Sequence, residues 1–552
     1  MATSNTRVDG GPFDFDLGLR GRWLLSAITV CCASGFLLVG YDNGVMGGLV
    51  ETPAFRETFN EPNASTIGNI VSLYEIGCFF GAISTFITGE RFGRRKTILI
   101  GSALMLFGAI VQAASHTVGV MILGRLISGL GMGAINATVP VLQAEMSPAW
   151  NRGAFVALDL TVLNIGIVLS YWVDYGFNFG SSPANKDRMG TAVWRVPIAL
   201  QCVFIVVVAV SAFVIPETPR WLAAKGRKHD AISVLVRLRA RTANGDFIGV
   251  QDDFNAIEEA VAQERATANR GWLSLVKPYG DSWRDDSMQT RKRLLLACFI
   301  QAAQQLGGIN ALIYYSSTLF TRSIGMAKKE AALMSGGLNM CLILGSTLSI
   351  FAIDRIGRRR LLLPCIAGMS LVMIIQSIVI KKIGDDASAS KVYGRVASSM
   401  LFLFALFFSL GFQATVWLIP SEILPLTIRT KGSALSTASN WICNFAIVKL
   451  TPSAIENIGW RTYVIFAILN AAWLPVIYFF LPETMGKTLE EVDLLFLRRA
   501  WETQTIRWNA HDGEAYAGNS TSEVVKDIKR EDQDGAYKGV GASPILLKTL
   551  SA

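Results

Sequence analysis

Residues 90–96 read Glu-Arg-Phe-Gly-Arg-Arg-Lys, and residues 354–360 read Asp-Arg-Ile-Gly-Arg-Arg-Arg. Both heptapeptides have an acid first, a glycine fourth and four basic residues at the same places. Each follows a long apolar stretch. The first motif lies near the start of the chain, and the second lies near the start of its second half. Such self-similarity at a distance predicts an internal duplication.

Two further features recur at corresponding places. The tripeptide Pro-Glu-Thr occurs at 216–218 and at 482–484, each time after the last apolar stretch of a half. An acid followed seven residues later by an arginine also occurs twice. These residues are Glu145 with Arg152 and Glu422 with Arg429. One such recurrence can arise by chance, because basic turns commonly only orient a membrane protein, but three matched pairs indicate a duplication.

The composition of the 552-residue chain is that of a membrane protein. Hydrophobic residues make up 51% and charged residues 17%, with a mean hydropathy of +0.40, whereas an average globular chain is about 25% charged. A membrane-spanning helix needs roughly 20 apolar residues. Reading with that length predicts an all-α integral membrane protein with twelve transmembrane helices in two six-helix halves. These spans are 23–49, 67–89, 97–115, 119–144, 154–175, 195–215, 294–318, 332–353, 361–380, 397–420, 433–452 and 462–481.

The polar segments divide the rest of the chain. The longest lies between the halves and contains two segments, 227–241 and 252–266, that read as charged or amphipathic helices. The C-terminal tail is rich in Gly, Ser and charge, which predicts disorder after about residue 497. The predicted regions are an N-terminal tail 1–22, a first half 23–215, a helical insertion 216–293, a second half 294–481 and a tail 482–552.

The basic residues predict the orientation in the membrane. The insertion 216–293 contains fourteen Lys and Arg, and cytoplasmic segments carry an excess of these residues. The short loops alone are a weaker guide, because several on the other side are basic too. With an even number of spans, both termini are then cytoplasmic. The sequon Asn63-Ala-Ser65 falls in an outer loop, whereas Asn136-Ala-Thr138 falls inside a helix.

Several classes of protein are disfavoured by what the chain contains. The net charge of +9 is explained by membrane orientation, so we expect no nucleic-acid partner. The eight cysteines lie in apolar runs without CxxC or ligand-spaced His, which predicts buried apolar thiols and neither a disulfide framework nor a metal site. We find no nucleophile–base set and no phosphate loop. We therefore expect no enzyme activity and no cofactor.

Several motifs together resemble the sugar porter family of the major facilitator superfamily, most of all its fungal members. Besides the two Gly-Arg-Arg loops, they are 40–44 (Gly-Tyr-Asp-Asn-Gly), 216–221 (Pro-Glu-Thr-Pro-Arg-Trp), 304–310 (Gln-Gln-Leu-Gly-Gly-Ile-Asn) and 482–488 (Pro-Glu-Thr-Met-Gly-Lys-Thr). The resemblance covers about residues 23–496 and departs from the family pattern at Phe86, where the family often has Gly. It implies the major facilitator fold and transport by alternating access. We expect a monomeric carrier in the plasma membrane.

The matched acids and arginines suggest a gate. Lying at the cytoplasmic ends of the spans, they are expected to form ion pairs between the halves that close the inner side and break when it opens. The residues are Glu90, Arg94, Glu145, Arg152, Glu217, Asp354, Arg358, Glu422, Arg429 and Glu483.

Polar side chains within a span are costly and are functional candidates by default. The seventh span concentrates them around the pair Gly307-Gly308, which we expect to bend the helix. Amides donate and accept hydrogen bonds, as a polyhydroxylated solute requires, although they also hold helices together. The resemblance implies substrate contacts at these positions and at others in the second half, and an outer gate at Tyr315. The substrate-contact candidates are Gln304, Gln305, Asn310, Tyr314, Gln413, Trp417 and Asn440, with Trp441 as an aromatic neighbour.

Two positions depart from the family pattern. Where the fifth and eighth spans of the family carry Gln and Asn, this chain has Leu160 and Leu342, with Asp159 and Asn339 nearby. The loss of two polar contacts weakens the case for a hexose. It favours a smaller polyol or a less hydroxylated solute.

Asp42 and Arg125 are a lone acid and a lone base within the first and fourth spans. The resemblance implies that they form the pair that couples transport to protons. A base beside an acid favours its ionised form, so weakening the pair in one conformation would let a proton bind. A purely structural ion pair is the alternative.

The leading interpretation is a plasma-membrane symporter for protons and a sugar or polyol. A facilitative hexose carrier, or a carrier of glycerol, quinate or another organic solute, is the alternative within transport. A non-transporting nutrient sensor is disfavoured, because the tail after about residue 497 is short for a signalling segment. The sequence leaves the solute and the direction of net flux open.

Overall fold

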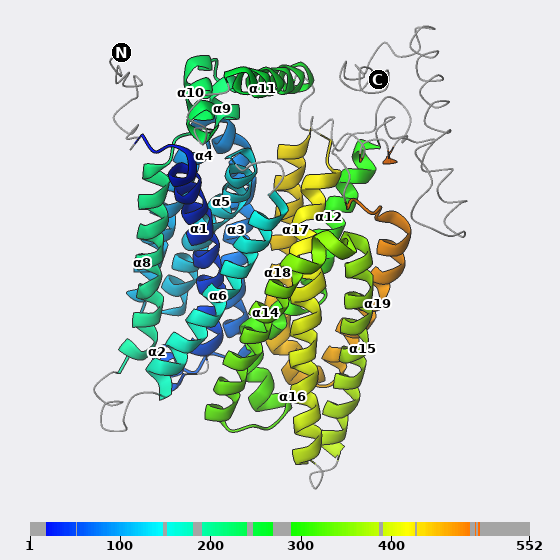
Figure 1. The fold of residues 1–552 in the computed structure, drawn as a ribbon. Coiled ribbons are helices and arrows are strands. Elements are labelled where there is room, and N and C mark those ends of the chain that lie inside the picture. Colours follow the sequence, from blue (N-terminus) through cyan, green and yellow to red (C-terminus); the bar gives the residue numbers. More distant parts are fainter. Residues whose placement is uncertain are drawn as a thin grey trace, which may run out of the picture. The chain divides into compact units, whose positions relative to one another are not determined.

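The computed structural model describes residues 18–50, 52–146, 152–179, 190–239, 247–268, 289–385, 390–425 and 428–485, together with 492, 495 and 496. The chain divides into two compact units. One comprises 1–271 and 294–485, and the other comprises 272–293 and 486–552. The first unit contains nearly all of the helices (Figure 1). In the second, the Arg293 guanidinium lies 4.7 Å from the centre of the Phe496 ring.

The described residues of the first half form six long helices. The third α-helix in the chain begins at an Asn63 cap, whose side-chain oxygen accepts a hydrogen bond from the Thr66 N–H at 2.8 Å, as helix starts require. The elements of this half are α1 (Gly21–Leu49), the short α2 (Pro53–Thr58), α3 (Ala64–Phe92), α4 (Arg94–Ala113), α5 (Val118–Met146), α6 (Arg152–Phe179) and α8 (Ala192–Val214).

The described residues of the insertion between the halves form three helices at one end of the helix bundle (Figure 1). They are α9 (Pro219–Ala224), α10 (Lys228–Arg239) and α11 (Phe247–Ala268). The last two confirm the helices expected near 227–241 and 252–266. We call the end of the bundle that carries α9–α11 the insertion side.

The second half repeats the six spans, two of them in pieces. The seventh span of the chain consists of three successive helices, and so does the tenth. The elements are α12 (Thr290–Leu306), α13 (Ile309–Thr318), η3 (Leu319–Ser323), α14 (Lys328–Ile356), α15 (Arg358–Asp385), α16 (Ser390–Phe407), η4 (Phe408–Phe412), α17 (Gln413–Ile423), α18 (Arg429–Ile458) and α19 (Arg461–Phe480).

Eleven spans of the described part are long and apolar enough to cross a membrane. The twelfth is α18, whose 30 residues are long enough but include buried polar side chains. These are Ser436, Thr437, Asn440, Asn444 and Thr451. Large apolar side chains on the outside of the bundle, such as Phe107, Phe351 and Phe479, are more than half exposed, as a lipid-facing surface requires. The predicted all-α fold of twelve spans is therefore confirmed.

The two Gly-Arg-Arg motifs are tight turns between helices on the insertion side. Gly93 and Gly357 have left-handed backbones, with φ of +89° and +98°. A Cβ atom would lie 2.4 Å from Oε2 of Glu217 at the first glycine and 2.7 Å from Oε2 of Glu483 at the second. Only glycine meets both requirements without strain.

In the first half, Glu217 closes this turn. Its carboxylate accepts hydrogen bonds from the backbone N–H groups of Arg94 (2.9 Å) and Arg95 (3.1 Å), which begin α4 and have no partner within the helix. Burial raises the pKa of the Glu217 carboxyl, whereas these hydrogen bonds favour the ionised form. The Arg94 side chain then reaches α5, where Nη2 lies 2.8 Å from Oε1 of Glu145.

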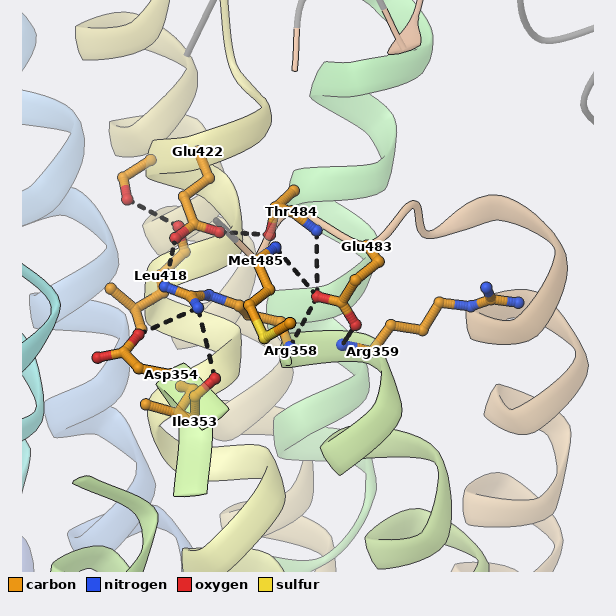
Figure 2. A network of polar contacts seen from close by, with 10 residues as sticks. Ile353, Asp354, Arg358, Arg359, Leu418, Glu422, Glu483, Thr484 and Met485 are labelled. Atoms are coloured by element: carbon orange, nitrogen blue, oxygen red, sulfur yellow. Dashed lines mark hydrogen bonds and ion pairs between the residues drawn. The ribbon is translucent and has the colours of Figure 1, made fainter. Parts of the chain in front are cut away.

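The second half repeats the arrangement (Figure 2). Glu483 accepts from the N–H groups of Arg358 (2.8 Å) and Arg359 (3.0 Å) at the start of α15. The Arg358 guanidinium lies between Asp354 and Glu422, with N–O distances of 3.1 Å to each. The matched motifs of the sequence are thus matched structures.

These ion pairs lie within the halves, and this differs from the expected gate between them. In the described part, Arg94 pairs with Glu145 and Arg358 pairs with Asp354 and Glu422, each in its own half. The physical reason is that each arginine starts a helix whose neighbour in the same half presents the acid. The side chains of Glu90, Arg152 and Arg429 lie outside the described part, so their role in a gate stays a prediction.

We expect Gly93→Ala to destabilise the protein by about 2 kcal/mol, because it combines a left-handed backbone with displacement of the Glu217 carboxylate. Thermal unfolding of the purified protein in detergent measures this. Gly89→Ala is the matched control, since a Cβ atom there meets nothing within 4 Å and the residue is helical. Equal melting temperatures for the two variants would contradict the role of the turn.

Candidate functional site

The seventh span breaks at its glycine pair, as the sequence predicts. α12 ends at Leu306 and α13 begins at Ile309, with Gly308 in a left-handed conformation (φ +96°). A Cβ atom at Gly308 would lie 2.7 Å from the Phe466 ring. The Asn470 amide donates a hydrogen bond of 3.0 Å to the freed Gly307 carbonyl. The break changes the direction in which the polar side chains before and after it point.

A cluster of amide side chains lies at this break. Asn310 donates to Oε1 of Gln305 at 2.6 Å, and Gln305 donates to Oδ1 of Asn440 at 2.9 Å. Asn440 of α18 in turn donates to the side-chain oxygens of Gln304 (3.0 Å) and Gln301 (2.7 Å). All five side chains are buried. We name Gln301, Gln304, Gln305, Asn310 and Asn440 the amide cluster.

Gln413, the next predicted contact, lies on α17 and reaches the first half. Its amide exchanges hydrogen bonds with Asn164 of α6, at 2.9 and 3.0 Å. Asn164 also donates to the Leu342 carbonyl of α14 at 3.1 Å. This contact joins the two halves through polar groups.

The two predicted aromatic residues differ in their surroundings. Trp441 is buried within the hydrophobic core that includes Leu160, whereas Trp417 is half-buried and packs at the edge of the same core. Trp417 is thus the more available of the two for a solute.

The predicted acid–base pair is formed. Arg125 Nη1 lies 3.3 Å from Oδ1 of Asp42, and both side chains are fully buried. The Arg125 guanidinium also lies 4.3 Å from the centre of the Tyr74 ring and donates to the Val71 carbonyl at 3.4 Å. One arginine thereby binds α1, α3 and α5 together.

The two tyrosines of α13 bond to different halves. Tyr315, expected at the gate, bonds within the second half, to the Val448 carbonyl of α18 at 3.0 Å. Tyr314, expected at the solute, crosses to the first half, where its hydroxyl lies 2.9 Å from Oδ1 of Asn43 and 2.7 Å from Oε1 of Glu75. The helix is kinked between these contacts, because Tyr315 has a non-helical backbone (φ −126°, ψ 19°).

The polar contacts between the halves lie along the middle and toward the side opposite the insertion. Besides those of Asn164 and Tyr314, the Tyr171 hydroxyl of α6 donates to the Ile313 carbonyl and lies 3.1 Å from the Ser316 hydroxyl. The ion pairs that the described residues form on the insertion side, by contrast, stay within the halves. In this conformation the halves are therefore held together on the side opposite the insertion.

The comparison with known proteins decides the family. Residues 27–496 match the family model described as "Sugar (and other) transporter". The chain belongs to this family. Its membership confirms the resemblance to sugar porters and agrees with the expectation of a transporter rather than an enzyme.

Three similar proteins come from fungi. This transporter is 37% identical to the MFS-type transporter oryC of Aspergillus oryzae over 86% of either chain. It is 34% identical to the sugar transporter STL1 of Saccharomyces cerevisiae, over 89% of this chain and 84% of that protein. It is 30% identical to a probable quinate permease of Neosartorya fischeri, over 89% and 90%.

The fold has solved counterparts. A structure of the proton:xylose symporter XylE with 6-bromo-6-deoxy-D-glucose superimposes with a TM-score of 0.71 at 24% identity, covering 86% of this chain and 99% of that one. At this identity the likeness concerns the fold, which is that of the major facilitator superfamily.

Sequence reasoning missed four polar residues of the site. Asn164 follows Leu160 by four residues, so the polar group missing at Leu160 is supplied one turn later on the same face of α6. Gln301 and Asn444 likewise lie three and four residues from Gln304 and Asn440. Glu75 carried a plainer signal, since it is an acid in the middle of a predicted span.

We expect a double-mutant cycle to detect the Asn164–Gln413 contact. Either single change to Ala leaves a buried amide without its partner, which costs about 1–3 kcal/mol, and the double variant removes both groups. The two losses of thermal stability should therefore sum to more than the loss in the double variant. Additive losses would show that the amides do not bond to each other.

Proposed function

We propose that this protein is a secondary active transporter that moves a neutral sugar or polyol together with a proton across the plasma membrane by alternating access. It acts as a monomer with both termini in the cytoplasm. The observation that carries the proposal is the amide cluster, which lies buried at the break of a span within the helix bundle. Amides in that setting supply the paired donors and acceptors that hydroxyl groups need.

The charge of the site favours a neutral solute. The amide cluster, Gln413 and Asn164 are uncharged, and the buried base Arg125 is paired with Asp42. A carboxylate such as quinate would need a countercharge when it leaves water. We therefore rank a sugar or polyol, in line with the sugar transporter STL1, above the substrate of the quinate permeases.

The Asp42–Arg125 pair supports proton coupling. An ion pair that is fully withdrawn from water strongly favours the ionised acid only while the base is near. Separating the two on reorganisation of α1 and α5 would make protonation of Asp42 favourable. Transport would then require a proton in each cycle, as it does in a proton symporter such as XylE.

Uptake of single solutes by a transporter-deficient yeast that expresses this chain tests the proposal. We expect growth on a neutral sugar or polyol as the sole carbon source. Growth on quinate alone, or on none of the panel, would contradict it. Vesicles with and without an imposed pH gradient then separate symport from facilitation.

We expect Asp42→Asn to abolish uphill accumulation of that solute while downhill exchange remains, because Asn can keep a hydrogen bond to Arg125 but cannot exchange a proton. Reconstituted vesicles with an imposed pH gradient give the measurement. Asp252→Asn, which changes an exposed acid of α11, should accumulate solute normally. Full accumulation by Asp42→Asn would remove Asp42 from the coupling mechanism.

The proposed orientation is testable through glycosylation. Asn63 is exposed at the start of α3 and uses its oxygen as the helix cap, so its nitrogen is the atom available for a glycan. We expect a mobility shift that a glycosidase removes and that Asn63→Gln abolishes, whereas Asn136→Gln, a change within α5, has no effect. A glycan on a sequon introduced between α10 and α11 would contradict the proposed orientation, because it would show that the insertion is not cytoplasmic.

A further inference from the structure

Glu75 is a buried acid that the mechanism above does not use. It lies on α3, has no solvent exposure, and touches the second half through Tyr314. One carboxyl oxygen, Oε1, lies 2.7 Å from the Tyr314 hydroxyl, and the other, Oε2, has no hydrogen-bond partner. An acid in such a place is costly unless it is neutralised.

The hydrogen atoms around Tyr314 indicate how Glu75 is neutralised. A tyrosine hydroxyl has one hydrogen to donate, yet it lies at bonding distance from Oδ1 of Asn43 and Oε1 of Glu75. An amide oxygen and an ionised carboxylate are both acceptors only. Both contacts are satisfied if Glu75 carries a proton and donates it to the Tyr314 oxygen, while Tyr314 donates to Asn43.

The charges nearby agree with this count. The buried pair Asp42 and Arg125 lies within electrostatic reach of Glu75, so two carboxyls face one guanidinium. If both acids were ionised, the cluster would carry a net negative charge away from water, and one proton removes it. The titratable and charged groups around Glu75 are Asp42 of α1, Tyr74 and Cys78 of α3, Arg125 of α5, and Tyr314 and Tyr315 of α13. The neighbouring α18 contributes a neutral amide, Asn444.

Asn444 of α18, the neighbour of Glu75, also bonds to the amide cluster. Its Oδ1 accepts a hydrogen bond of 2.6 Å from Asn310, which donates its second hydrogen to Gln305. Glu75 therefore lies next to a residue that bonds to the proposed solute site.

We propose that Glu75 is a second proton-binding residue of this transporter and that its proton permits the Tyr314 contact that joins the halves opposite the insertion side. With that contact open, Glu75 takes its proton from water on that side, forming the O–H bond at Oε1. When the contact closes, the O–H group donates to Tyr314. When Glu75 loses the proton, the single hydroxyl hydrogen of Tyr314 lies between two acceptors, Asn43 and Glu75, which favours reopening of the Tyr314 contact. This inference rests on the proposed function only for its role in transport, since protonation of Glu75 is testable by itself.

Infrared spectroscopy of the full chain in lipid vesicles, without solute, measures the protonation directly. Protonated carboxyls have a carbonyl stretch that carboxylates lack. We expect the wild type to show a component of this absorption at neutral pH that Glu75→Gln removes. Tyr314→Phe should shift that component to higher frequency, because the acid loses its acceptor. Glu57→Gln, which changes an exposed acid of α2, should leave it unchanged.

Identical spectra for wild type and Glu75→Gln in this region would overturn the proposal. The Asn43 amide would then be turned, with its nitrogen donating to Tyr314 and Tyr314 donating to an ionised Glu75. A second readout is the pH profile of solute exchange. Gln mimics the protonated acid, so we expect Glu75→Gln to exchange solute with a weaker loss at high pH than wild type. An unchanged profile would deny Glu75 a role in transport, whereas absence of exchange in wild type would refute the proposed function instead.

Discussion

The burial of the Arg125 guanidinium constrains the first half more than any other feature. A full positive charge among apolar helices needs an opposite charge and filled hydrogen bonds. Asp42 of α1 supplies the opposite charge, and the Val71 carbonyl and the Tyr74 ring of α3 supply further contacts, whereas Nε of Arg125 has no hydrogen-bond partner. Three spans are thereby bound to one side chain. In the proposed function, a motion that separates them also changes the charge on Asp42. That link between helix position and protonation is what a proton-coupled carrier requires.

The duplication builds two similar scaffolds, but the contacts between them are not duplicated. Each half repeats its own turn, in which Glu217 or Glu483 caps a helix and an arginine reaches the next one. Tyr314 and Asn164, in contrast, bond across the halves without a matching contact among the described residues of the insertion side. The buried acids Asp42 and Glu75 lie in the first half, and the amide cluster lies in the second. The Tyr314 hydroxyl of the second half bonds to Glu75 of the first.

Much of this arrangement could be predicted from the sequence. Local patterns in the sequence were enough to predict the spans, the repeated Gly-Arg-Arg turns and the polar residues of the seventh span. The partners of each arginine could not be predicted, because the sequence alone does not say which helices are neighbours. Arg94 and Arg358 pair within their own halves, and the predicted gate between the halves stays a prediction. That Tyr314 bonds across the halves and Tyr315 within its own could not be predicted either, because the non-helical backbone of Tyr315 leaves no local signal in the sequence. Asn164 was not predicted, because only the family position at Leu160 was considered and not the position one helical turn later on the same face.

The central claim is that movement of solute and movement of protons are a single event. Wild-type protein in sealed vesicles without an imposed gradient, with a pH-sensitive dye outside, tests it most directly. Addition of the neutral solute that supports growth should make the outer medium more alkaline, in proportion to the solute taken up. Uptake of the same solute with no change in the dye signal would contradict the account.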